Sequence, residues 1–405
     1  MIKIQFFLKH RGGYGDSYDP YEYDYDFSDY SDPYSDEYGG PYDDSYTESY
    51  SNEYSDEYGN EYSDEYSSSY SGTLSSGLAN SAAFIAAALN NNPANGIEAE
   101  ICHVSNNNLI SREVTRFKPD IVIIEAYWVV PSKFAFLTKA HPTVKWVIRN
   151  HSEIPFAAQE GIVMEWSLRY PSYPNVFVAC NSTRAFHDLS TLIGAIYPNE
   201  SKQLLYLPNI YPTVLITTSC PKPEDNFLDV ACFGAIRPLK NQLMQAIAAI
   251  AFAEQIGKTL RFHINTVTGG PTGSAILKNL VSLFKLLPNL QLIQHPWYPH
   301  DQFLELLATM DLGLQVSFSE TFNIVSADMV CVGLPIVTSS EVIWAPPVVF
   351  ANPTDCKDII GTMTTVWGGR ENRRINDVVP QSQKALNSYS GSALNYWLMG
   401  INNLL

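Results

Sequence analysis

The chain has 405 residues, a formal net charge of −17 and six cysteines, and its length leaves room for two domains. No run of about 18 or more apolar residues occurs, so no transmembrane helix is expected. The start of the chain has too short an apolar run for a signal peptide, and the scattered cysteines show no C-x-x-C spacing. Both features favour a cytoplasmic protein with reduced thiols over a disulfide-stabilised secreted one.

The negative charge is concentrated in one segment. Residues 14–70 contain 18 Asp and Glu and no Lys or Arg. Removing those 18 from the total of 42 leaves 24 acids against 25 Lys and Arg, so the rest of the chain is close to neutral. A near-neutral body carries no strong electrostatic signature of nucleic-acid binding.

The same segment is a low-complexity repeat, in which Tyr recurs at every fourth position from Tyr30 to Tyr70, eleven times in all. Only polar residues, glycines and prolines separate these tyrosines. Too little apolar area is available to offset the entropy of ordering the chain, so we predict that residues 14–71 are a disordered insertion. Its role stays open between a passive insertion, an acidic tether for a partner, an anionic flap and a set of tyrosine sugar acceptors.

The insertion follows the first predicted strand, Ile2–Leu8, and a glycine-rich turn that contains Gly13. A helix over Ala82–Leu89 then opens a series of short apolar segments separated by helical patterns. The strands predicted in this series are Ile97–Val104, Pro119–Glu125, Val144–Ile148, Val176–Ala179 and Leu204–Leu207. Strands that alternate with helices predict a parallel sheet, with ligands at the carboxyl ends of its strands. His151 follows one such strand end.

A stretch with prolines and lysines, Pro212–Asp225, interrupts this pattern and predicts a linker. We therefore place an N-terminal Rossmann-like domain at residues 1–13 plus 72–215 and a C-terminal one at residues 220–385. Residues 386–405 contain an apolar helix that ends the chain.

The second domain opens with the predicted strand Leu228–Phe233, a loop with Arg237 and Lys240, and a helix over Gln242–Ile256. A guanidinium and an ammonium group at a helix start can together neutralise a diphosphate. As isolated residues they would instead be solvated loop cations. The next predicted elements are the strands Leu260–Val267 and Leu290–Gln294 and a helix over Asp301–Met310.

Residues 310–338 have the pattern of a strand, a loop, a helix and a second strand. Asp311–Val316 alternates and is predicted to be a strand, and the helix after the loop is predicted to begin at Glu320 and Thr321. Free amides at a helix start favour phosphate, and a carboxylate on the same turn indicates a ligand site. Asp328 lies among apolar neighbours, where a buried acid needs a partner. The alternative is a surface Glu at a helix start and a capped Asp.

The segment Glu320–Asp328 resembles the E-x7-E element of retaining glycosyltransferases with the GT-B fold, in the family 4-like group, with Asp for the second Glu. The resemblance implies an α/β fold of two Rossmann-like domains that face a cleft, with the acidic insertion after the first strand. It implies that the N-terminal domain binds the acceptor, that the C-terminal domain binds the donor, and that the last helix returns to the first domain.

The resemblance also implies roles for single residues. Glu320 would fix the hydroxyls of the donor sugar, His151 would support its anomeric region, and Asp328 would bind the nucleotide ribose. The donor-binding residues implied in all are Gly13, Arg237, Lys240, Asn241, Thr321, Phe322, Asn323 and Asp328.

The implied reaction is the transfer of a sugar from a nucleotide-sugar donor, with retention and without a metal or other cofactor. The sequence has no metal-ligand spacing outside the repeat. The resemblance implies that no metal is needed, because Arg237, Lys240 and the helix amides would take its place.

The acceptor is open. The runs Ser75–Ser81, Glu125–Trp128 and His151–Glu160 resemble glycosyltransferases encoded by tailed bacteriophages, which implies a modified DNA base as acceptor and the host cytoplasm as location. A glycan, a lipid-linked glycan or a protein is the alternative acceptor. The alternative function is a catalytically inactive GT-B scaffold that binds a partner through the tyrosine repeat.

Overall fold

The computed structural model places the residues that it describes in one compact unit. These are residues 1–9, 77–91, 95–196, 203–216, 225–266, 270–287, 289–371 and 378–405. The predicted disordered insertion at 14–71, Gly13 and residues 217–224 of the predicted linker lie outside the described part of the chain.

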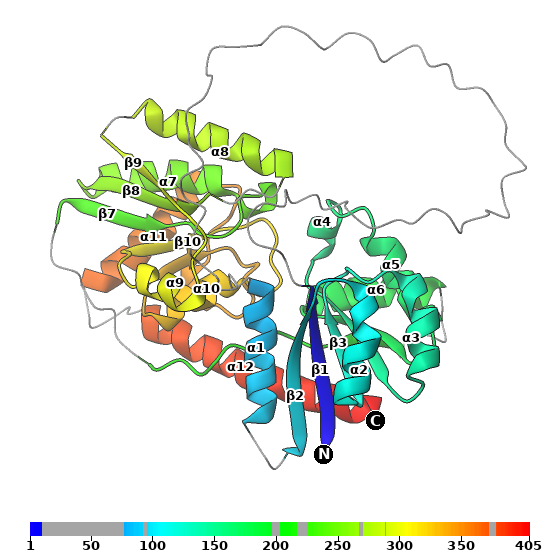
Figure 1. Ribbon diagram of the computed structural model, residues 1–405. Helices are drawn as coiled ribbons and strands as arrows, with labels where there is room; N and C mark the ends of the chain where they lie inside the picture. Colours follow the sequence, from blue (N-terminus) through cyan, green and yellow to red (C-terminus); the bar gives the residue numbers. More distant parts are fainter. Residues whose placement is uncertain are drawn as a thin grey trace, which may run out of the picture. The chain divides into compact units, whose positions relative to one another are not determined.

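The first half of the described chain, which extends past β6, contains a parallel sheet with the strand order β2-β1-β3-β4-β5-β6 (Figure 1). Its strands are β1 Ile2–Lys9, β2 Ile97–Val104, β3 Ile121–Glu125, β4 Lys145–Asn150, β5 Val176–Cys180 and β6 Leu204–Tyr206. Its α-helices are α1 Gly77–Asn90, α2 Ile110–Phe117, α3 Phe134–Ala140, α4 Ile154–Ala157, α5 Val163–Arg169 and α6 Thr183–Ile196. The alternation of strand and helix confirms the parallel α/β architecture expected from the sequence.

A second parallel sheet has the order β11-β10-β7-β8-β9. Its strands are β7 Phe227–Ala231, β8 Thr259–Asn265, β9 Gln291–His295, β10 Leu312–Gln315 and β11 Ile336–Thr338. The helices that follow them are α7 Gln242–Gln255, α8 Gly270–Lys285, α9 His300–Leu307, α10 Ile324–Cys331, α11 Cys356–Glu371 and α12 Val378–Leu404. In each sheet the strand order reverses once, between β1 and β3 and between β7 and β10.

The central strands are buried on both faces, which explains their runs of apolar residues. Helices α7 and α8 lie on one face of the second sheet, and α9 and α10 lie on the other (Figure 1). The strand predicted at Asp311–Val316 is β10, and all four of its residues are buried. Helix α10 packs so closely on β10 that a Cβ added to Gly313 would come within 2.5 Å of Met329 Sδ.

Helix α10 begins at Ile324, so the prediction of a helix start at Glu320 and Thr321 is wrong. The preceding residue, Asn323, has a φ of 58° and accepts a hydrogen bond from the Ser326 amide at 2.9 Å. A residue in this left-handed conformation caps a helix but cannot continue it. The predicted first turn is therefore a loop, which brings Glu320 to the end of the preceding strand.

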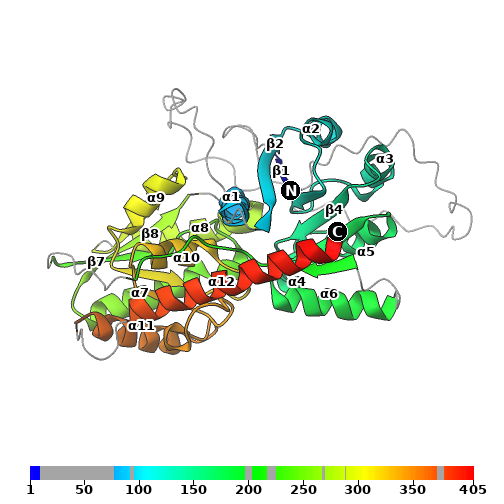
Figure 2. The ribbon, with the colours of Figure 1, turned by 90° about the horizontal axis from the view of Figure 1, so that it is seen from below.

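The last helix, α12, begins at Val378, earlier than the apolar pattern predicts, and runs along both halves of the described chain (Figure 2). Near its middle, Ser390 accepts a hydrogen bond from the Tyr211 amide at 3.1 Å. Near its end, the Trp397 indole donates to the Pro208 carbonyl at 2.7 Å and its ring packs against Phe6 of β1. The helix therefore packs against the first sheet, the connecting segment and helix α10.

Candidate active site

The loops after β7 and β10 meet at the point where the strand order of the second sheet reverses. β7 and β10 are neighbours in the sheet, although β8 and β9 come between them in the chain. In open parallel sheets, this position at the carboxyl ends of the strands is where ligands bind. The first loop contains Arg237 and Lys240, and the second contains Glu320, so the strand order brings together residues that lie about eighty positions apart in the chain.

An ion pair joins these loops. Lys240 Nζ lies 2.6 Å from Oε1 and 2.8 Å from Oε2 of Glu320. The Glu320 side chain is 6% exposed and that of Lys240 27%, so the carboxylate is nearly buried while the ammonium still reaches solvent. A desolvated carboxylate needs such a partner. The pair therefore presents a positive and a negative group side by side at the strand ends.

Asn323 orients the carboxylate from the other side. Its side-chain amide donates to Glu320 Oε1 at 2.9 Å and to Gln315 Oε1 at 3.0 Å, while its carbonyl oxygen caps helix α10. One side chain thus fixes both the start of the helix and the position of Glu320.

Three further predicted donor-binding residues, Arg237, Asn241 and Phe322, make different kinds of contact. Arg237 lies with its guanidinium carbon 5.0 Å from the centre of the Phe156 ring, which belongs to the first half. Asn241 donates to the carbonyls of Val316 and Pro353 at 3.0 and 2.9 Å, so its amide joins two loops. Phe322 is 1% exposed within the core of the second half, so only its main chain can reach a ligand.

Asp328 has the partners that its burial requires. Tyr211 Oη donates to its Oδ1 at 2.7 Å, and His300 Nε2 lies 2.8 Å from the same oxygen. Burial raises the pKa of Asp328, although His300 and Tyr211 act against that rise. The hydrogen bond to Asp328 in turn raises the pKa of His300. A ribose contact by Asp328 would have to use an oxygen that neither partner occupies.

His151 belongs to a buried polar network at the ends of β3 and β4. Its Nε2 lies 2.5 Å from Glu125 Oε2, and its Nδ1 lies 3.4 Å from the side-chain nitrogen of Asn181. Glu125 also pairs with Arg149 at 3.0 Å, and both of these side chains are fully buried. Burial and the charge of Arg149 lower the pKa of His151. The neutral imidazole therefore donates through Nε2 to Glu125 and accepts through Nδ1.

Two side chains of the first half hold the loop that carries Glu320. Asn181 donates to the Thr321 hydroxyl at 3.0 Å, and Arg184 Nη2 donates to the main-chain carbonyl of Glu320 at 3.0 Å. Arg184 Nη1 pairs with Glu341 at 2.8 Å. Sequence reasoning missed both residues as site components. Asn181 follows a predicted strand end, which is a weak signal, but Arg184 carries no signal in the sequence.

The main chain of two glycines lies close to the first side chains of α10. A Cβ added to Gly77, the first residue of α1, would lie 3.0 Å from Ile324 Cγ2, and one added to Gly234 would lie 4.0 Å from Val325 Cγ2. Gly234 has a φ of 113°, a conformation that side chains disfavour. The first turns of α1 and α10 and the loop after β7 therefore converge at one point, where helix amides favour an anion.

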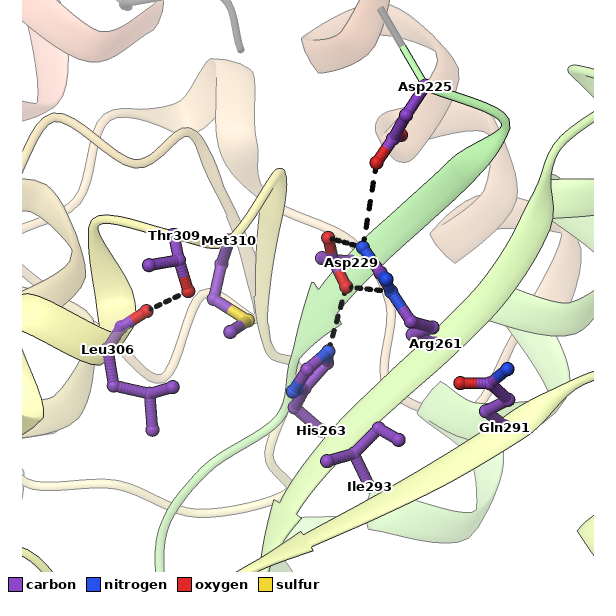
Figure 3. Close-up of a pocket in the computed structure, with 9 residues that line it drawn as sticks. All are labelled: Asp225, Asp229, Arg261, His263, Gln291, Ile293, Leu306, Thr309 and Met310. Atoms are coloured by element: carbon purple, nitrogen blue, oxygen red, sulfur yellow. Dashed lines mark hydrogen bonds and ion pairs between the residues drawn. The ribbon is translucent and has the colours of Figure 1, made fainter. Parts of the chain in front are cut away.

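A separate hollow of about 550 Å³ is lined by residues of β7, β8 and β9 and by residues at the end of α9 (Figure 3). Arg261 holds Asp229 with two contacts of 2.6 Å, and His263 Nε2 lies 2.9 Å from the same carboxylate. These residues lie within β7 and β8 and not in the loops that follow them. The hollow therefore does not belong to the candidate active site, which is formed by those loops.

Within the described ranges, no group of three or more His, Cys, Asp or Glu could hold a metal ion. Among the same residues, no helix is both long and apolar enough to cross a membrane.

No protein-family model matches the sequence, and no curated protein matches it. Solved structures do match. The chain is similar to the trehalose-6-phosphate synthase OtsA, with a TM-score of 0.56 over 74% of this chain and 75% of that one, at 13% identity. The fold is GT-B.

Two further GT-B structures have similar scores. One is a UDP-forming trehalose-phosphate synthase from Burkholderia xenovorans, with a TM-score of 0.55 at 11% identity over 73% of this chain and 77% of that one. The other is S. aureus TarM in complex with UDP, with a TM-score of 0.52 at 11% identity over 73% of this chain and 58% of that one. At such low identities, these structural matches show the fold alone. They confirm the fold class expected from the sequence.

Proposed function

We propose that this protein is a glycosyltransferase that moves a sugar from a nucleotide-sugar donor to an acceptor, with retention and without a metal. The observation that carries the proposal is the Lys240–Glu320 pair, 2.6 Å apart where the strand order of a GT-B sheet reverses. Similar structures hold UDP-2-fluoro glucose or UDP. One similar enzyme, a trehalose-6-phosphate synthase, is described as transferring its glycosyl group with retention.

Lys240 and Arg237 stabilise the leaving group, a nucleoside diphosphate. A nucleoside diphosphate gains negative charge as the bond to the sugar breaks, and preorganised positive groups stabilise that charge in the transition state. Lys240 supplies a point charge and Arg237 a planar set of donors. The free amides at the start of α10 add further donors at the same place.

The polar groups of the Glu320 loop bind the donor sugar. Glu320 accepts hydrogen bonds from sugar hydroxyls, with Thr321 and Asn323 beside it. His151 supports the anomeric region from the first half, held in a fixed orientation by Glu125. Asp328 and His300 form the ribose end of the site, and the main chain of Phe322 and the amide of Asn241 shape the loops between them.

The finer assignments are part of the same proposal. The Glu320–Asp328 spacing favours the family 4-like group, and the run His151–Glu160 favours a bacteriophage-encoded enzyme. The acceptor would then be a modified DNA base, or else a glycan.

The first experiment is a thermal-shift screen of nucleoside diphosphates and nucleotide-sugars with the full chain. A ligand that binds only the native state raises the melting temperature. We expect one nucleotide class to raise it, and we expect the Lys240→Ala variant to lose that shift because the diphosphate loses its cation. Lys285→Ala, an exposed lysine on α8, is the matched control and should keep the shift.

Donor turnover is measured on the same proteins as release of nucleoside diphosphate. The Glu320→Ala variant should lose turnover but keep the shift with free nucleoside diphosphate, since Glu320 contacts the sugar. A panel with neither a shift nor turnover would contradict the proposal and favour the inactive scaffold as the function.

A further inference from the structure

Helix α12 has an exposed face without charged side chains. No Asp, Glu, Lys or Arg occurs from Ala385 to Leu405, the end of the chain as given. Figure 2 shows the helix in front of the other elements, and its side chains Ser388, Ser392 and Tyr396 are exposed. The outer face of a helix that meets only water normally carries charged residues, whereas the centre of a protein interface is depleted in them. The outer face of α12 therefore has the composition of an interface.

Large apolar side chains are exposed on this face and beside it. Tyr396 on α12 is 46% exposed, and Leu215 and Ile216 of the connecting segment are 81% and 48% exposed. The connecting segment is fixed to α12, because the Asn387 side chain accepts from the Val214 amide and donates to the Val214 carbonyl, both at 2.8 Å. Exposed apolar side chains gathered over neighbouring elements indicate a protein interaction site.

The shape of the face beside Tyr396 matches an aromatic ring. Gly391 is exposed within α12, and a Cβ added to it would meet no atom of the described residues within 4 Å. Glycine destabilises a helix interior relative to alanine, and no described neighbour requires it here. Positions three and four apart lie on one side of a helix, so Gly391 and the small side chains of Ser388 and Ser392 together leave a shallow depression. The face thus presents a ring next to a place where a ring can pack.

We propose that the outer face of α12 is the interface between two copies of this chain, which pair antiparallel about a two-fold axis at Ser392. Residues at equal distances on either side of the axis then meet. Tyr396 follows the axis by four positions and Ser388 precedes it by four, so each Tyr396 packs over Ser388 and Gly391 of the other copy. Met399 lies at the rim, where truncation costs little. The dimer does not depend on the proposed donor chemistry.

The absence of charge favours a second copy over other partners. A two-fold axis brings each charge near the same charge of the other copy, which is repulsive, and α12 has no such charge beyond Lys384. A membrane surface or a nucleic acid would be recognised by Lys and Arg, and a charged protein by charges of opposite sign. The face from Ala385 to Leu405 contains none of these groups.

The test measures the mass of the full chain by sedimentation equilibrium over a range of concentrations. We expect a dimer of twice 45.3 kDa. Tyr396→Glu removes the ring and places a carboxylate near the axis in both copies, so the dissociation constant should rise at least about thirtyfold. Gly391→Gln fills the depression and should have a similar effect, although it makes the helix itself more favourable. Far-UV circular dichroism checks that both variants remain folded.

Each variant has a matched control. Phe136→Glu replaces another exposed aromatic residue, on α3, which is 54% exposed. Gly361→Gln replaces an exposed glycine of α11 that also has no described neighbour within 4 Å of an added Cβ. Both controls should dimerise like the wild type.

Three results would overturn the inference. One is a wild type that stays monomeric at about 0.1 mM. Another is a dimer that both Tyr396→Glu and Gly391→Gln leave intact, which would assign the contact to a different surface. The third is a monomeric wild type that sediments with phosphatidylcholine vesicles and loses that binding in Tyr396→Glu, which would assign the face of α12 to a lipid surface.

Discussion

Asp328 illustrates how a buried acid obtains hydrogen-bond partners from side chains distant in sequence. His300 begins helix α9, and its Nε2 lies 2.8 Å from Asp328 Oδ1 on helix α10. The rings of Phe84 and Tyr211 pack beside this pair. The pair thus joins α9, α10 and the connecting segment, and it lies at the end of the site where the ribose is proposed to bind.

The stability that His300 supplies should depend on pH. The hydrogen bond to Asp328 raises the pKa of His300 above its ordinary value of 6.5, with burial opposing. A raised pKa means that the full contribution is present below 6.5 and is lost as the pH rises through the folded value. We expect the difference in unfolding free energy between wild type and His300→Gln to be larger at about pH 6 than at about pH 9, measured by chemical denaturation.

His187→Gln is the control, because His187 is exposed on α6. It shows the effect of replacing an imidazole at the surface. A His300→Gln difference that is the same at both pH values would show that the imidazolium does not stabilise the native state.

The residues of the site differ in how far the sequence could predict them. Glu320 and Lys240 could be predicted as site residues, because charged side chains after strand ends rarely pack in a hydrophobic core. The structure brings the two into contact. Arg184 could not be predicted, because its partner is a main-chain carbonyl 136 positions away. A contact of that kind requires no particular residue in the partner and leaves no pattern.

At the scale of elements, helix α6 of the first half determines where the Glu320 loop lies. Its first turn contains Arg184, which holds the Glu320 carbonyl, and the strand end before it contains Asn181, which holds Thr321. These contacts from the first half add to those of Lys240 and Asn323 with Glu320, because a carboxylate that binds a sugar must be positioned to within a fraction of an ångström.

The Arg184→Ala variant tests this role. Without its guanidinium, the Glu320 loop should lose its position relative to the first half, so we expect kcat for donor turnover to fall about tenfold or more. Binding of nucleoside diphosphate should persist, since Lys240 is unaffected. Arg184→Lys, which can keep one hydrogen bond, should recover part of the rate.

Glu341→Gln is the matched control, because Glu341 forms an ion pair with Arg184 Nη1 at 2.8 Å. It should leave kcat near the wild-type value, because the bond to the Glu320 carbonyl remains. Equal losses in Arg184→Ala and Glu341→Gln would assign the effect to general stability and not to the position of Glu320.

At the scale of the whole molecule, helix α12 joins parts of the described chain that are far apart in sequence. Trp397 is fully buried, packs against Phe6 and covers the guanidinium of Arg149 at 5.4 Å. Replacing it with Ala leaves a large cavity and removes the hydrogen bond to Pro208, so we expect a loss of about 3–5 kcal/mol in unfolding free energy, measured by chemical denaturation.

Met399→Ala, two residues further on, is the control. Its side chain is 60% exposed, so the change should be within about 0.5 kcal/mol. A similar small effect for Trp397→Ala would mean that the end of α12 contributes little to the stability of the fold.

The sequence alone determined the α/β class, the two groups of strands and the charged residues at the strand ends, because hydrophobic periodicity and turn chemistry are local properties. It did not determine that α10 starts at Ile324, which depends on the left-handed conformation of Asn323. It also did not determine that β10 is buried on both faces, because that depends on which helices cover the sheet. The tertiary structure alone decided which polar groups meet, since Glu125, Arg149 and Asn181 come together around His151 only when three strand ends align.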